Sequence, residues 1–203
     1  ILLGIWLQWT DESVVDGIEK PIVKAAALIA PVIICVGLAC LVLDLTKPFH
    51  FWIILIKYNL SSVMSLGVIA LLLFTPLAFA YALIVFQDEL ESLPVLPTVT
   101  EILRPLRKIV EVLLFLMAFI VAIYTGFLLS AMNSYPMLNT AVLPALFLFS
   151  ALSAGAAANN LVSVLFFKAD LNDEQSVKLH SFELPVIGLE VLFLVLLFIG
   201  LYF

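Results

Sequence analysis

Charged side chains are scarce in this sequence. Asp, Glu, Lys and Arg make up 12% of the 203 residues, whereas soluble domains carry about a quarter. The nine Lys and Arg residues are outnumbered by fifteen Asp and Glu residues, so the protein has no positive field for nucleic-acid phosphates. With 65% apolar residues and a mean hydropathy of +1.24, the sequence argues against a water-soluble domain and predicts a protein embedded in lipid.

Metal-ligating residues are equally few. The two histidines, His50 and His180, lie between apolar runs, so they are not placed to ligate a haem from spanning helices. The sequence contains no CxxC, HExxH, GxSxG or P-loop pattern. Cys35 and Cys40 lie in one apolar run, and we expect them to be small buried thiols. We therefore expect no haem or iron–sulfur cluster to be ligated by this chain, and any redox centre to belong to a partner.

Five apolar runs are long enough to cross a bilayer, which takes about 20 helical residues. None shows the alternating pattern of a membrane barrel strand. We therefore predict an all-α fold, a polytopic transmembrane helical bundle with at least five spanning helices in this chain. The runs are Ile22–Leu43, Val63–Phe86, Ile109–Ser130, Ala141–Phe167 and Leu184–Phe203.

The runs divide the chain into three parts. Residues 1–21 are predicted to form a partial or interfacial N-terminal segment, because Ile1–Trp9 would span only about 14 Å as a helix. We also expect the chain to begin inside a longer protein. Residues 22–167 are predicted to form a four-helix membrane bundle. Residues 168–203 are predicted to form a cytoplasmic loop and a further transmembrane helix.

Lys and Arg residues are unevenly divided between the two sides of the bundle. Seven lie on one side, and only Lys47 and Lys57 lie on the other. By the positive-inside rule, the richer side faces the cytoplasm. Segments 44–62 and 131–140 are then expected to face the periplasm or the exterior. The seven residues are Lys20, Lys24, Arg104, Arg107, Lys108, Lys168 and Lys178.

Polar side chains gather at the outer ends of the first three runs. Tyr124 lies about two turns inside the third run, and Ser130 and Asn133 follow it at i+6 and i+9, so we expect the three to lie roughly along one face. Such groups in an apolar pocket suit an amphipathic ligand. Asp44 could instead pair with Lys47 at a helix end, and Tyr124 could belong to an interfacial aromatic belt. The same cluster includes Ser62, Met64, Ser65 and Gly67.

One carboxylate lies deep in an apolar run. Glu190 is about two turns inside the last run, where an ionisable group is unfavourable and suggests a function. We expect it to form a proton pathway with Glu183 and Asp44. The alternative is that the Glu190 side chain reaches back to the cytoplasmic interface.

Four sequence motifs occur in this chain, and the four in this order are more specific to one protein family than any of them alone. Together they cover about half of the chain and resemble the NrfD/PsrC family. Members of that family are integral membrane subunits of polysulfide reductase and related respiratory complexes. The stretches are Leu43-Asp44-Leu45-Thr46-Lys47-Pro48 with Phe51-Trp52, Ser62-Val63-Met64-Ser65-Leu66-Gly67, Tyr124–Ala131, and Pro136–Thr140 followed by Leu143-Pro144 and Phe147–Ala157.

The resemblance implies a menaquinone or ubiquinone headgroup bound within the bundle, with Tyr124 and Asp44 in contact with it. Together with Ser130 and Asn133 they form the predicted quinone-binding site. The resemblance also implies an iron–sulfur subunit and a catalytic subunit of molybdoenzyme, cytochrome or hydrogenase type. These partners would dock on the side of segments 44–62 and 131–140. The expected location is the cytoplasmic (inner) membrane of a bacterium or archaeon, as a multi-pass protein.

The predicted function is a quinone- or quinol-binding membrane subunit that exchanges electrons with a partner iron–sulfur subunit. Quinol oxidation releases two electrons and two protons, so a hydroxyl such as that of Tyr124 can hold a ring oxygen while a carboxylate accepts a proton. Two other functions are compatible with the sequence. One is a proton or ion transporter that uses Asp44, Glu183 and Glu190, and the other is a purely structural membrane anchor.

Overall fold

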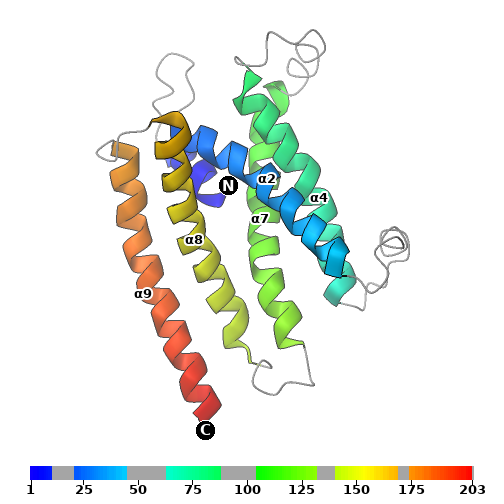
Figure 1. Ribbon diagram of the computed structural model, residues 1–203, viewed down its shortest axis with the longest axis vertical. Helices are drawn as coiled ribbons and strands as arrows, with labels where there is room; N and C mark the ends of the chain where they lie inside the picture. Colours follow the sequence, from blue (N-terminus) through cyan, green and yellow to red (C-terminus); the bar gives the residue numbers. More distant parts are fainter. Residues whose placement is uncertain (11–20, 45–62, 88–103, 132–139, 169–173, 203) are drawn as a thin grey trace.

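Every regular element that the computed structural model describes is a helix (Figure 1), which confirms the predicted all-α fold. The structure describes residues 1–10, 21–44, 63–87, 104–131, 140–168 and 174–202. The helices are α1 (Leu2–Thr10), α2 (Pro21–Asp44), α4 (Val63–Val85), the short 3₁₀ helix η2 (Arg104–Leu106), α7 (Arg107–Ser130), α8 (Val142–Phe167) and α9 (Glu174–Tyr202).

Five of these helices are long and apolar enough to cross a membrane, as the sequence predicted. They contain between 23 and 29 residues, and 23 residues already span about 35 Å. Successive helices run in opposite directions, so their ends form two groups (Figure 1). We call the end that holds Arg107 the basic end, and the opposite end the Asp44 end. The protein is a multi-pass membrane protein.

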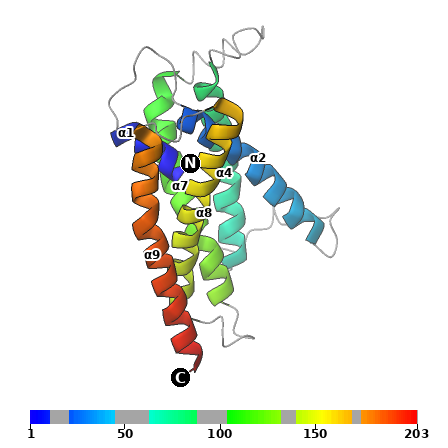
Figure 2. The same cartoon turned by 60° about the vertical axis from the view of Figure 1, so that its left-hand side comes forward.

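Helix α1 is short, yet it lies within the bundle near the basic end (Figure 2) and contacts α2, α7, α8 and α9. Its residues join two apolar clusters, because Ile5 packs with side chains of α2, α4 and α7 while Leu3 and Leu7 pack with those of α2, α8 and α9. The crossing with α2 is close, since a Cβ on Gly4 would lie 2.7 Å from the Cβ of Ala26. Helix α1 is therefore part of the core of the bundle.

Helix α2 is inclined across its neighbours (Figures 1 and 2). Its first half packs into both apolar clusters, whereas Val32 and Val36 in the second half are more than half exposed. Cys35 and Cys40 lie in this second half and are exposed, so the prediction of buried thiols is wrong. The reason is that α2 leans away from the bundle, a tilt that its uniformly apolar sequence does not reveal.

Candidate functional site

The aromatic ring of Tyr124 lies directly against the backbone of α4 at Gly67. A Cβ built on Gly67 would overlap the ring, and its nearest neighbours would be Cζ, Cε2 and the hydroxyl oxygen of Tyr124. Only glycine, which has no Cβ, leaves room for the ring at this position. Gly67 is buried and Tyr124 is half-buried, both near the Asp44 end. The structure thus brings together two residues of the predicted polar cluster.

A pocket of about 630 Å³ opens at the same end, between α7 and α8. Its walls are apolar except for the hydroxyl-bearing residues Ser130 and Thr140. The Ser130 hydroxyl donates to the carbonyl oxygen of Phe127 at 3.0 Å, which leaves its own oxygen able to accept a hydrogen bond. The Thr140 hydroxyl is buried and has no hydrogen-bond partner among the described residues. The other wall residues are Ile123, Phe127, Ala141, Pro144, Ala145 and Leu148.

Tyr124 and Ser130 contact different neighbours. Six residues of α-helix turn through about 600°, so two side chains six positions apart point in directions about 120° apart. Accordingly, Tyr124 faces α4 at Gly67, whereas Ser130 lines the pocket beside α8. The two hydroxyl groups therefore lie on two sides of α7 rather than in one cleft.

Two of the remaining predicted site residues, Glu183 and Glu190, have described side chains, and both lie on α9. Asp44 ends α2, but its side chain, like the whole of Asn133, lies outside the described residues. Glu183 lies in α9 with its Oε2 atom 3.4 Å from Nδ1 of His180. Glu190 is half-buried two turns further along the same helix. The two α9 carboxylates therefore lie on one helix.

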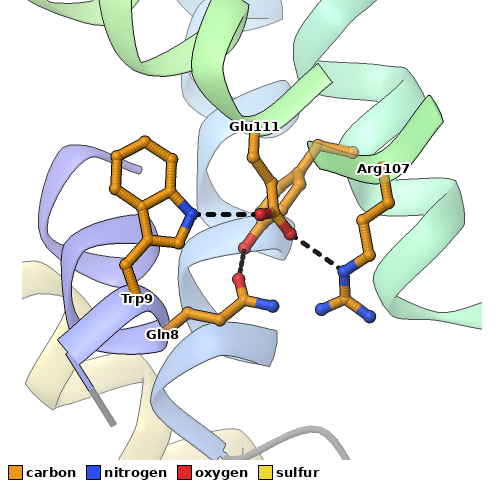
Figure 3. Close-up of polar contacts among 5 residues, drawn as sticks. Gln8, Trp9, Arg107 and Glu111 are labelled. Carbon is orange, nitrogen blue, oxygen red and sulfur yellow. Dashed lines mark hydrogen bonds and ion pairs between the residues drawn. The ribbon is translucent and has the colours of Figure 1, made fainter. Parts of the chain in front are cut away.

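A buried polar network at the basic end was not predicted from the sequence (Figure 3). The Glu111 side chain, in a residue only 3% exposed, accepts hydrogen bonds from Nε1 of Trp9 at 3.1 Å and from Nε of Arg107 at 2.9 Å. Beside it, the hydroxyl of the fully buried Tyr81 donates to Oε1 of Gln8 at 3.0 Å. The network joins α1 to both α4 and α7.

Part of this network could have been predicted from the sequence. Glu111 is a carboxylate inside an apolar run, the same feature that singled out Glu190. Arg107 precedes it by four residues, which places the two side chains on one helix face. Trp9 is 102 residues away from Glu111, and only the packing of α1 against α7 brings the two together.

The Asp44 end offers hydroxyl groups in apolar surroundings, an arrangement suited to an amphipathic ligand with polar atoms at one end. The basic end instead holds a network whose groups are bonded to one another. Within the described helices, His, Cys, Asp and Glu side chains nowhere form a group of three that could hold a metal ion.

Comparison with known proteins identifies one family. The family model described as "Polysulphide reductase, NrfD" matches residues 2–203. The C subunit of polysulfide reductase from Wolinella succinogenes is 44% identical over 201 residues, which cover 98% of this chain and 62% of that protein. The NrfD homolog of Haemophilus influenzae is 37% identical, covering 90% of this chain and 59% of that protein.

Protein NrfD of Escherichia coli is 34% identical, covering 91% of this chain and 61% of that protein. The chain thus spans about three fifths of the length of these curated relatives. The comparison with solved structures found no match.

Proposed function

This chain belongs to the NrfD family of polysulphide reductase proteins, and from that premise we propose that it forms the quinone-binding part of a respiratory oxidoreductase membrane subunit. The subunit exchanges electrons between membrane quinone and a partner iron–sulfur subunit. The observation that carries this proposal is the placement of the Tyr124 ring on Gly67. The pocket that Ser130 and Thr140 line at the same end supports it.

The groups at the Asp44 end fit the head of menaquinone or ubiquinone, whose two ring oxygens accept hydrogen bonds. In the proposed site the Tyr124 hydroxyl donates to one ring oxygen beside Gly67, where α7 and α4 meet. Because Ser130 lies on another side of α7 from Tyr124, Ser130 and Asn133 are proposed to contact the quinone away from the Tyr124 hydroxyl, at the pocket between α7 and α8. The bound quinone supplies two-electron, two-proton chemistry, and the protein supplies position and proton exits.

Carboxylates are proposed to carry the protons of this reaction. Asp44 ends α2 at the same end as Tyr124 and is assigned the first transfer. Glu190 and Glu183 are assigned a further pathway along α9, because a half-buried carboxylate inside a spanning helix is unfavourable without a role. Nδ1 of His180 lies 3.4 Å from Oε2 of Glu183, and its side chain is 72% exposed, so His180 is proposed to connect this pathway to solvent.

The partners are proposed to dock over segments 44–62 and 131–140, because electrons must reach a cluster close to Tyr124. They comprise the iron–sulfur subunit and a catalytic subunit of molybdoenzyme, cytochrome or hydrogenase type. The basic end is proposed to face the cytoplasm of a bacterium or archaeon, with the protein in its inner membrane.

The Tyr124→Phe variant tests the proposal in the assembled full-length complex. Loss of the hydroxyl removes one hydrogen bond to the ring, so we expect turnover with quinol as electron donor to fall roughly tenfold. Assembly should be unchanged, because the ring that rests on Gly67 is kept. Turnover is measured with a short-chain quinol and the natural terminal substrate.

The matched control is Tyr81→Phe, which removes a tyrosine hydroxyl at the basic end. That hydroxyl bonds Gln8, so its loss should lower stability by about 1 kcal/mol and leave quinol turnover unchanged. Equal effects of the two variants on turnover, or no effect of Tyr124→Phe, would contradict the proposed site.

A further inference from the structure

The pocket between α7 and α8 brings together two hydroxyl groups from different walls. Ser130 ends α7, and Thr140 lies just before the start of α8. The walls are close because α7 and α8 cross at Gly126, where an added Cβ would lie 2.4 Å from the Cα of Pro144. The carbonyl oxygen of Thr140 accepts a hydrogen bond from the amide of Leu143 at 3.3 Å, which ties Thr140 to the first turn of α8. The two hydroxyl groups are therefore fixed in apolar surroundings.

These two hydroxyl groups differ in the hydrogen bonds that they can still form. A carbonyl oxygen can only accept, so the hydrogen of the Ser130 hydroxyl is used on the carbonyl oxygen of Phe127, and its oxygen can only accept from a ligand. The Oγ1 atom of Thr140 is buried and has no hydrogen-bond partner among the described residues, so its hydrogen is available. A buried hydroxyl without a partner is unfavourable in apolar surroundings. The pocket thus presents one donor and one acceptor.

A quinol hydroxyl matches both groups, whereas a quinone oxygen matches only one. The oxygen of a quinol C–O–H group can accept from Thr140 while its hydrogen is donated to Ser130. A quinone ring oxygen carries no hydrogen, so it can accept from Thr140 but gives nothing to Ser130. We propose that Thr140 and Ser130 hold one hydroxyl of the quinol, on the side of the ring away from Tyr124, so that the subunit binds quinol more tightly than quinone. This inference rests on the quinone-binding function proposed above.

Two variants of the assembled full-length complex separate the donor from the acceptor. Thr140→Val replaces the hydroxyl by a methyl group, so the dissociation constants of a short-chain quinone and of its quinol should both rise about fivefold. Ser130→Ala removes only the acceptor, so the dissociation constant of the quinol should rise about fivefold and that of the quinone should not change. Both constants are measured by equilibrium titration, with the quinol kept under anaerobic, reducing conditions.

The matched control is Thr125→Val, which removes a hydroxyl that bonds the carbonyl oxygen of Ala122 within α7 and is not part of the pocket wall. Its dissociation constants should equal those of the parent. Thr140→Val should not lower the melting temperature, because it removes a buried hydroxyl that has no partner among the described residues. A lower melting temperature with unchanged dissociation constants would overturn the proposal, because the hydroxyl would then stabilise the protein rather than bind a ligand.

Tyr124→Phe distinguishes a failure of this proposal from a failure of the proposed function. If Tyr124→Phe lowers quinol turnover while Thr140→Val and Ser130→Ala bind both forms like the parent, the donor and acceptor pair is wrong and the quinone site stands. If none of the three variants changes binding or turnover, the proposed function fails as well. An equal rise of both dissociation constants in Ser130→Ala would overturn the preference for quinol.

Discussion

Replacing Gly67 by alanine in the assembled full-length complex is expected to lower quinol-linked kcat/KM on the order of a hundredfold. The new methyl group would overlap the Tyr124 ring, so the ring must turn away or α4 and α7 must move apart. A displacement of about 1 Å in a group that positions a substrate can lower a rate by a factor of about 10². The measurement is steady-state oxidation of a short-chain quinol by the purified complex.

Gly188→Ala is the matched control for this prediction. A Cβ on Gly188 would meet no atom within 4 Å, and an open helical glycine replaced by alanine should raise stability slightly. Turnover of this variant should equal that of the parent. If Gly67→Ala keeps full turnover, the contact between Tyr124 and Gly67 does not position the quinol.

Removing the carboxylate of Glu111 is expected to lower stability more than Tyr81→Phe or Glu183→Ala does. Glu111→Ala leaves Nε of Arg107 and Nε1 of Trp9 without their acceptor in the interior of the protein. Breaking a buried ion pair costs about 3–5 kcal/mol, and we expect about 2–4 kcal/mol here because the Arg107 side chain is 27% exposed. The melting temperature in detergent should fall by roughly 5–12 °C.

Two further variants separate the buried network from a general loss of charge. Glu183→Ala removes a carboxylate whose partner, His180, has a side chain that is 72% exposed, and it should change the melting temperature little. Replacing both Glu111 and Arg107 by leucine should recover much of the stability, because the buried charge is then removed together with its partner. A Glu111→Ala protein as stable as the parent would show that the network does not hold α1 in place.

The spanning helices could be predicted because hydropathy and length decide them locally. Each of the five predicted runs coincides with most of one spanning helix. The tilt of each helix and the burial of its side chains in the bundle could not be predicted in this way. Helix α2 carries apolar side chains on all of its own faces. Its sequence therefore does not indicate that the first half packs in the bundle while the second half, with Cys35 and Cys40, is exposed. The central position of α1 likewise depends on its contacts with four other helices.

The candidate site was predicted only in part. The two residues Tyr124 and Gly67 were expected in one cluster because both lie near the outer ends of their runs, and the structure places them in contact. The spacing of Tyr124 and Ser130 along α7 predicted their positions less well, because Ser130 lies on another side of that helix. The bond between Trp9 and Glu111 joins residues 102 positions apart, and no local pattern encodes it.

Photolabelling of the full-length complex tests the proposed quinone site most directly. A quinone with a photoreactive group on its head is bound, irradiated and located by peptide mass spectrometry. We expect labelled residues within 63–70 of α4 and 124–130 of α7, and weaker labelling in Tyr124→Phe. Labelling confined to the Glu111 network at the basic end, or to α9, would contradict the proposed site.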